Sequence, residues 1–202
     1  MLIEAGADVN TAQGGPYDNA LQAAADGGHD SIVKMLIEAG ADVNTAQGGP
    51  YDNALQAAAW RGHDSTVKML IEAGADVNAK GEYYSNALQA AAWRGHDSTV
   101  KMLIEAGADV NAKGEYYSNA LQAAAWRGHD STVKMLIEAG ADVNAKGGYY
   151  SNALQAAAGG GHDSIVKMLI EAGADANTAQ GGPYDNALSA AVASIMKRHP
   201  RC

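Results

Sequence analysis

The sequence predicts an all-α solenoid in which helix-turn-helix units stack along one axis and carry short hairpin or turn tips. The phrase Asn-Ala-Leu begins at residues 19, 53, 86, 119, 152 and 186, so it recurs every 33 or 34 residues. Each period contains an Ala-rich run, an amphipathic run and a polar connector. Neither run is long enough to form a stable helix alone, so each must be buried against its neighbours in a repeat array.

The period divides the chain into one continuous array. The full units are residues 19–52, 53–85, 86–118, 119–151 and 152–185, and the half units are residues 1–18 and 186–202. The second and third full units are identical, and the fourth differs from them only by Gly148 in place of glutamate. We therefore expect the inner units to fold alike.

The Ala-rich run is expected to form the first helix of each unit, as at residues 53–61. The segment Asn53-Ala-Leu-Gln-Ala-Ala-Ala-Trp-Arg61 contains strong helix formers. Gly62 follows it and readily adopts the left-handed conformation that ends helices. The small alanines make this helix thinner than its partner, which predicts a stack that bends toward the first helices and gives them a concave surface.

The amphipathic run is expected to form the second helix, at residues 66–73 of the same unit. Its apolar stripe has the i, i+3, i+4 spacing of a helix and consists of Val67, Leu70 and Ile71. Asp64 and Ser65 are candidates to cap its start, and Gly74 is expected to stop it. The connector that follows contains Gly81 and favours a turn or short hairpin over a third helix.

The recurring residues carry a resemblance to a known family. In the 53–85 unit they are Gly62-His63, Val67, Leu70-Ile71 and Gly74-Ala75-Asp76-Val77-Asn78. This pattern resembles the ankyrin repeat and covers almost the whole chain, which implies stacked pairs of antiparallel helices. The sequences of the first helix and of the connectors are similar to those of ankyrin arrays at the C-terminal ends of fungal NACHT-type receptors. The near-identical copies also fit an engineered or recently duplicated array.

One departure from the family lies at the start of the first helix. The family's usual Thr-Pro-Leu-His is here Asn53-Ala54-Leu55-Gln56. The change removes the first-turn proline and the histidine-centred hydrogen bonds that the resemblance implies. We expect the Asn and Gln amides to replace those bonds.

A recurring His-Asp-Ser sequence invites a catalytic or metal-binding interpretation, which geometry disfavours. Its histidines are His29, His63, His96, His129 and His162. Stacked helices lie about 8–10 Å apart, whereas histidine nitrogens lie about 2 Å from a bound first-row metal. Adjacent His, Asp and Ser residues also lack the geometry of a base and its nucleophile. We expect the imidazoles to bond backbone between repeats, and the chain to be non-catalytic, without metal or cofactor.

Charge and composition exclude several classes of partner. The chain has 14 basic and 23 acidic side chains, a formal charge of −9, which argues against nucleic acid and anionic membranes. No apolar run reaches the roughly 18 residues of a membrane-spanning helix. The lone Cys202 cannot close an internal disulfide, so a reducing, cytoplasmic location is expected.

Three Trp-Arg pairs at the ends of the inner first helices are the sharpest candidates for partner binding. They are Trp60-Arg61, Trp93-Arg94 and Trp126-Arg127. The ankyrin resemblance places them on the concave face, where family members usually meet their ligands, and Trp and Arg are enriched at binding hot spots. The alternative is a packing role, in which each indole covers the alanines of the next first helix while its Arg is solvated.

Tyrosines at the connector tips form a second candidate row. Alternation along the tip predicts that one tyrosine of each pair packs inward and the other faces outward. The outer units keep tyrosine only at the second position, so the expected inward set is Tyr84, Tyr117 and Tyr150. The expected surface residues are Tyr83, Tyr116 and Tyr149, with the acidic Glu82 and Glu115 beside them.

These features together predict a non-catalytic protein-protein interaction module that binds a protein partner on its concave surface. The alternative is a structural or engineered scaffold without an evolved ligand. The half units add head-to-tail assembly, because residues 1–18 carry part of a second helix and residues 186–202 carry a first helix. An excised piece of a longer array would show the same two ends.

Overall fold

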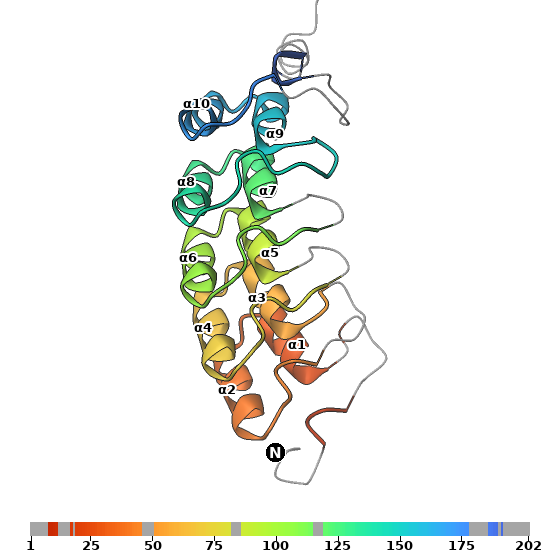
Figure 1. The fold of residues 1–202 in the computed structure, drawn as a ribbon. Helices are drawn as coiled ribbons and strands as arrows, with labels where there is room; N and C mark the ends of the chain where they lie inside the picture. Colours follow the sequence, from red (N-terminus) through yellow and green to blue (C-terminus); the bar gives the residue numbers. More distant parts are fainter. Residues whose placement is uncertain are drawn as a thin grey trace, which may run out of the picture.

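The computed structural model describes residues 8–11, 17, 19–45, 51–81, 86–114, 119–177, 186–189 and 191. Within them the chain is all-helical, as expected, and contains no strand. The first helices are α1 (Ala20–Asp26), α3 (Ala54–Arg61), α5 (Ala87–Arg94), α7 (Ala120–Arg127) and α9 (Ala153–Gly160). The second helices are α2 (Asp30–Glu38), α4 (Asp64–Glu72), α6 (Asp97–Glu105), α8 (Asp130–Glu138) and α10 (Asp163–Glu171). The two sets form two parallel rows, which together make the predicted solenoid (Figure 1).

Helix α3 ends where the sequence predicts and begins one residue later. In α3 the Asn53 side chain caps the helix, because its Oδ1 accepts a hydrogen bond of 2.8 Å from the backbone N–H of Gln56. At the other end Gly62 has a φ of 73°, in the left-handed region. The helix therefore begins at Ala54, one residue after the predicted start.

The second helices begin differently from the prediction. In α4 the residue before the helix is His63, which makes no side-chain capping bond, and Asp64 is the first helical residue. The Asp64 carboxylate instead accepts a hydrogen bond of 2.6 Å from the Thr99 hydroxyl in the next unit. The predicted cap by Asp64 or Ser65 is therefore wrong, because this aspartate links consecutive units.

The core runs continuously between the two rows of helices. Leu70, Leu103 and Leu136 of the second helices are fully buried, and they pack with the buried alanines and leucines of the first helices. The alanines allow the first helices to approach one another closely. Because one cluster of buried residues extends through the described units, the units stabilise each other as the sequence predicts.

A ladder of asparagine amides joins the units along the connectors. Asn78 Nδ2 donates to the Gly107 carbonyl at 3.1 Å, and Asn78 Oδ1 accepts from the Asp109 backbone N–H at 2.8 Å. The same pair of bonds is made by Asn10, Asn44, Asn111 and Asn144. We call these contacts the Asn ladder.

The glutamine amides also take the predicted place of the family's histidine. Gln56 Nε2 donates to the Ala79 carbonyl of its own connector at 3.3 Å, and Gln89 Nε2 donates to Ala112 at 3.1 Å. Each bond ties the first helix to the base of the connector.

Candidate functional site

The arginines that end the first helices each contact a side chain of the preceding unit. We call each of these contacts a rung. The first rung pairs Asp26 with Arg61, the second pairs Trp60 with Arg94, and the third pairs Trp93 with Arg127. Each of these helices ends at its arginine and is followed by a glycine in the left-handed conformation, so the arginine has the same position in consecutive units.

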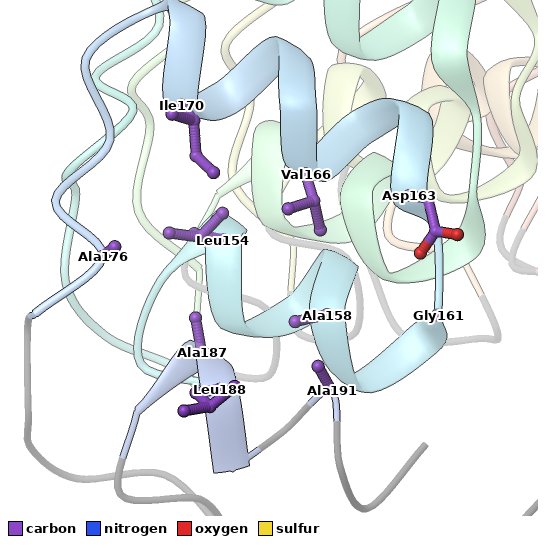
Figure 2. Close-up of a pocket in the computed structure, with 10 residues that line it drawn as sticks. All are labelled: Leu154, Ala158, Gly161, Asp163, Val166, Ile170, Ala176, Ala187, Leu188 and Ala191. Atoms are coloured by element: carbon purple, nitrogen blue, oxygen red, sulfur yellow. The ribbon is translucent and has the colours of Figure 1, made fainter. Parts of the chain in front are cut away.

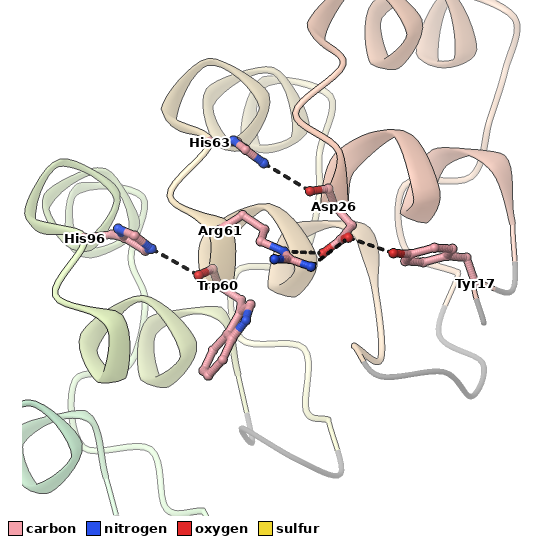
Figure 3. A network of polar contacts seen from close by, with 6 residues as sticks. All are labelled: Tyr17, Asp26, Trp60, Arg61, His63 and His96. Atoms are coloured by element: carbon pink, nitrogen blue, oxygen red, sulfur yellow. Dashed lines mark hydrogen bonds and ion pairs between the residues drawn. The ribbon is translucent and has the colours of Figure 1, made fainter. Parts of the chain in front are cut away.

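The first rung is an ion pair supported by a tyrosine (Figure 3). Arg61 Nε donates to Asp26 Oδ1 at 2.8 Å, and Arg61 Nη2 donates to Asp26 Oδ2 at 3.2 Å. The Tyr17 hydroxyl donates to Asp26 Oδ2 at 2.8 Å. The carboxylate is only 8% exposed, so its charge is neutralised inside the array.

These contacts determine the protonation of the pair. Burial alone raises the pKa of Asp26, but the hydrogen bonds from Arg61 and Tyr17 outweigh it, and the pKa lies below its ordinary value of 3.8. The pKa of Tyr17 is raised, mainly because its hydroxyl donates to Asp26. The pair is thus charged, and the tyrosine neutral, throughout the neutral range.

The second and third rungs replace the carboxylate by an indole. The Arg94 guanidinium carbon lies 4.9 Å from the Trp60 ring centroid, and that of Arg127 lies 4.9 Å from the Trp93 centroid. Both tryptophans are half-buried and both arginines are exposed. The partly buried indoles and the exposed arginines agree with the packing alternative, and each guanidinium in addition lies over the indole of the preceding unit.

The rung pattern ends at Trp126, because Gly160 occupies the arginine position of α9. Tyr150 stacks on the Trp126 ring with centroids 4.2 Å apart, and Tyr149 meets Tyr150 edge-on at 4.8 Å. A hydrogen bond of 3.0 Å from the Gly147 N–H to the Ser151 carbonyl closes this connector tip.

Tyr149 and Tyr150 test the expected alternation at this tip. Tyr150 is 8% exposed and Tyr149 is 61% exposed, which confirms the inward and outward assignment for this pair. The other predicted tip residues, Tyr83, Tyr84, Glu82, Tyr116, Tyr117 and Glu115, lie outside the described residues.

The recurring histidines join consecutive units, as expected. His96 Nε2 donates to the Trp60 carbonyl at 3.0 Å, and His63 Nε2 donates to the Asp26 carbonyl at 3.0 Å (Figure 3). His129 and His162 make the same bond to Trp93 and Trp126. This bond fixes the backbone of the residue whose side chain contributes to the next rung, so the histidines position the rungs.

The pKa of His129 is shifted by the groups around it. The pKa of His129 is lowered, first by burial and further by the positive charge of Arg127, although the Trp93 carbonyl acts in the opposite direction.

No group of three or more potential metal ligands occurs in the part of the chain that the structure describes. No helix of that part is long and apolar enough to span a membrane.

A cavity of about 400 Å³ lies at the C-terminal end of the described array (Figure 2). Its lining comes from α9, from α10 and from the short helical stretch that begins at Ala187. Leu154, Val166 and Leu188 give it an apolar wall. Ile170 of α10 is 51% exposed beside it, whereas Ile137 at the same position of α8 is partly buried.

Sequence reasoning missed two residues of the candidate site, Asp26 and Tyr17. Asp26 was visible only as the residue that replaces Trp in the first full unit. The available signal was its position, because the residue one unit before Trp60 is an aspartate, whereas the residue one unit before Trp93 is again a tryptophan. That comparison predicts an ion pair once units are known to contact through this position.

Comparison with protein families agrees with the geometry. The family model described as ankyrin repeats (3 copies) matches residues 1–81, 52–114, 80–147 and 121–199. A comparison with curated proteins gave no match. The overlapping matches cover nearly the whole chain, and the stacked helix pairs and recurring histidine bonds repeat at the same interval. The chain therefore belongs to the ankyrin repeat family.

Proposed function

We propose that this chain is a non-catalytic module that binds a protein partner on the surface formed by the rungs and the connector tips, on the concave side of the array. Ankyrin repeats are generally protein-protein interaction modules, which supports the class of function. The observation that carries the choice of surface is the second and third rungs, where exposed arginines lie on half-buried indoles.

The chemistry of this surface suits recognition. Trp and Arg contribute more to binding hot spots than most residues, because they bury large areas and carry directional donors. The second and third rungs hold Trp60 and Trp93 beneath Arg94 and Arg127, and Tyr149 at the adjacent tip is exposed. Trp126, Arg61, Tyr83, Tyr116, Glu82 and Glu115 complete the proposed surface.

The recurring histidines support a non-catalytic role. Each of His63, His96 and His129 donates its Nε2 hydrogen to a backbone carbonyl of the preceding unit. The aspartates that follow the first two, Asp64 and Asp97, accept hydrogen bonds from threonines of the next unit. The His-Asp-Ser groups therefore connect repeats, and their side chains point to different units.

Affinity capture from a cell extract, quantified by mass spectrometry, tests the proposed surface. A variant with Trp60, Trp93 and Trp126 all replaced by Ala should lose the partners that the intact array retains. The matched control replaces Lys68, Lys101 and Lys134 by Ala, because these exposed residues lie on the second helices and pair only with a glutamate of their own helix. Circular dichroism confirms that both variants stay folded. Recovery of the same partners by a folded Trp variant would contradict the proposal.

Head-to-tail assembly is a second candidate function, favoured by the two described ends of the array. The Asn177 backbone N–H donates to Asp175 Oδ1 at 2.8 Å, as in the other turns of the Asn ladder. The side-chain amide of Asn177 has no partner of the Asn ladder among the described residues. At the other end Ile32 is exposed, whereas Ile165 at the same position of α10 is fully buried. The exposed Ile170 of one copy would be covered by a second helix of the next.

Light scattering over a range of protein concentrations tests this second candidate. The average mass should rise with concentration for the intact chain, and Ile170→Asp should prevent the rise. Ile137→Asp is not a suitable control, because Ile137 packs against the core, so Lys167→Ala on the same helix serves instead. A mass that stays at one chain at all concentrations would exclude assembly.

Origin and location also remain proposals. The 53–85 and 86–118 units have identical sequences, which supports recent duplication or engineering. The connector sequences support a relation to fungal NACHT-type receptor arrays. The lone Cys202 supports a cytoplasmic location.

A further inference from the structure

The first rung shows how a guanidinium at this position behaves when a carboxylate is within reach. Arg61 donates two hydrogen bonds to Asp26, at 2.8 and 3.2 Å, and Tyr17 holds the same carboxylate from the other side. This is the bidentate geometry in which arginine recognises carboxylates most strongly. The array thus contains, within its own chain, an example of the ligand that suits this arginine.

The second and third rungs have the same arginine without the carboxylate. Arg94 and Arg127 are exposed, and within the described residues they make no hydrogen bond or ion pair, only the contacts with Trp60 and Trp93. A guanidinium that lies over an aromatic ring keeps its N–H donors available at its edge. The indole also limits the movement of the side chain, which lowers the entropy lost when a ligand binds.

We propose that Arg94 and Arg127 bind two carboxylates of one acidic segment in a protein partner, an inference that rests on the proposed function of the rung surface. Consecutive first helices pack about 8–10 Å apart. An extended chain advances about 3.3 Å per residue, so acidic residues at i and i+3 span the same distance. The segment that fits is therefore extended and carries Asp or Glu at that spacing.

The distribution of charge favours a short acidic segment over a nucleic acid. The second, third and fourth full units carry net charges of −1, −1 and 0, whereas the first and fifth carry −4 and −3. A segment with two carboxylates meets only the nearly neutral inner units. A nucleic acid would extend its phosphates over the acidic outer units, where they are repelled.

Binding of short labelled peptides, measured by fluorescence anisotropy at low salt, tests the proposal. The probe is the peptide Gly-Glu-Ser-Pro-Glu-Gly, whose glutamates stand at i and i+3. We expect it to bind at least tenfold more tightly than the same peptide with both glutamates replaced by Gln, and more tightly than Gly-Glu-Glu-Ser-Pro-Gly, because each charge-assisted bond contributes about 1.5–3 kcal/mol.

Variants of the array locate the peptide. Arg94→Gln and Arg127→Gln should each weaken binding about tenfold or more. Lys101→Gln is the matched control and should leave the affinity unchanged, because it removes one exposed positive charge from a second helix, where Lys101 pairs with Glu105 and not with a rung. These substitutions lie at exposed positions, and circular dichroism checks that the variants remain folded.

Several results would overturn the proposal. The Gln peptide could bind as tightly as the Glu peptide, or Lys101→Gln could weaken binding as much as Arg94→Gln. Tighter binding of a single-stranded oligonucleotide or of a phosphoserine peptide than of the Glu peptide would assign the arginines to phosphate. If the Trp variant loses captured partners while an Arg94→Gln, Arg127→Gln double variant retains them, the rung surface still binds protein and only the acidic segment is excluded.

Discussion

Arg61 and Arg94 occupy the same position in consecutive units, yet one guanidinium is neutralised within the chain and the other is not. Arg61 forms an ion pair with the buried Asp26, whereas Arg94 lies over the Trp60 ring. Their own helices have the same sequence, ALQAAAWR, and the same glycine stop. The difference therefore arises from the preceding unit, which places Asp26 beside Arg61 and Trp60 beside Arg94.

This comparison shows how a repeat array can vary its surface without altering its framework. The Asn ladder and the histidine bonds are made in the same way on both sides of the second full unit. Where the first helix of the preceding unit supplies Asp26, the arginine forms a closed ion pair, and where it supplies Trp60, the arginine is an exposed cation on an aromatic ring. The framework and the rung surface are thus controlled by separate positions.

The largest expected effect comes from removing the arginine of the first rung. Arg61→Gln leaves the Asp26 carboxylate buried without its cation, which should lower the free energy of unfolding by about 1–3 kcal/mol. Arg94→Gln removes only an exposed cation-π contact, which should lower it by about 0.5–1 kcal/mol. Urea denaturation followed by circular dichroism measures both variants. Equal losses would contradict the distinction between the two rungs.

A smaller effect is expected from pH, again confined to the first rung. The pKa of folded Asp26 is below its ordinary value of 3.8, so the stability that the ion pair provides is present above pH 3.8 and is lost as the pH falls through the folded pKa. The stability difference between the intact chain and Asp26→Asn should therefore shrink as the solution is acidified from pH 7 toward pH 2. Trp60→Phe, in the second rung, provides the control, because no carboxylate takes part there. A difference that stays constant with pH would show that the Asp26 charge is not involved.

Most of the fold could be predicted from local signals. The 33-residue period, the Ala-rich run before Gly62 and the stripe of Val67 and Leu70 together locate both helices to within two residues. These signals act over a few residues, where backbone preference and apolar spacing decide the structure. The inter-repeat histidine bond was also predictable, because the same residue recurs between the two helices of every full unit.

The rungs could not be predicted, since they join residues more than 30 positions apart. Whether Arg94 reaches Trp60 or solvent depends on the rise and rotation between units, which no local pattern specifies. The same is true of Asp64, which was expected to cap its own helix and instead accepts a bond from Thr99 of the next unit. The sequence identified the Trp-Arg pairs as candidates, but only the structure shows that the contacts link each arginine to the preceding unit.

The smallest expected effect concerns His129, which lies beside an arginine that has no anionic partner among the described residues. Burial and the Arg127 charge lower the pKa of His129, so the neutral imidazole is favoured in the folded chain, and its stabilising contribution is lost as the pH falls from 6.5 through the folded pKa. NMR titration of the imidazole protons should give a pKa below 6.5. Arg127→Gln should move this pKa upward but leave it below 6.5, because burial is the larger cause. No movement in that variant would mean that the Arg127 charge is already neutralised in solution, and the third rung would then resemble the first.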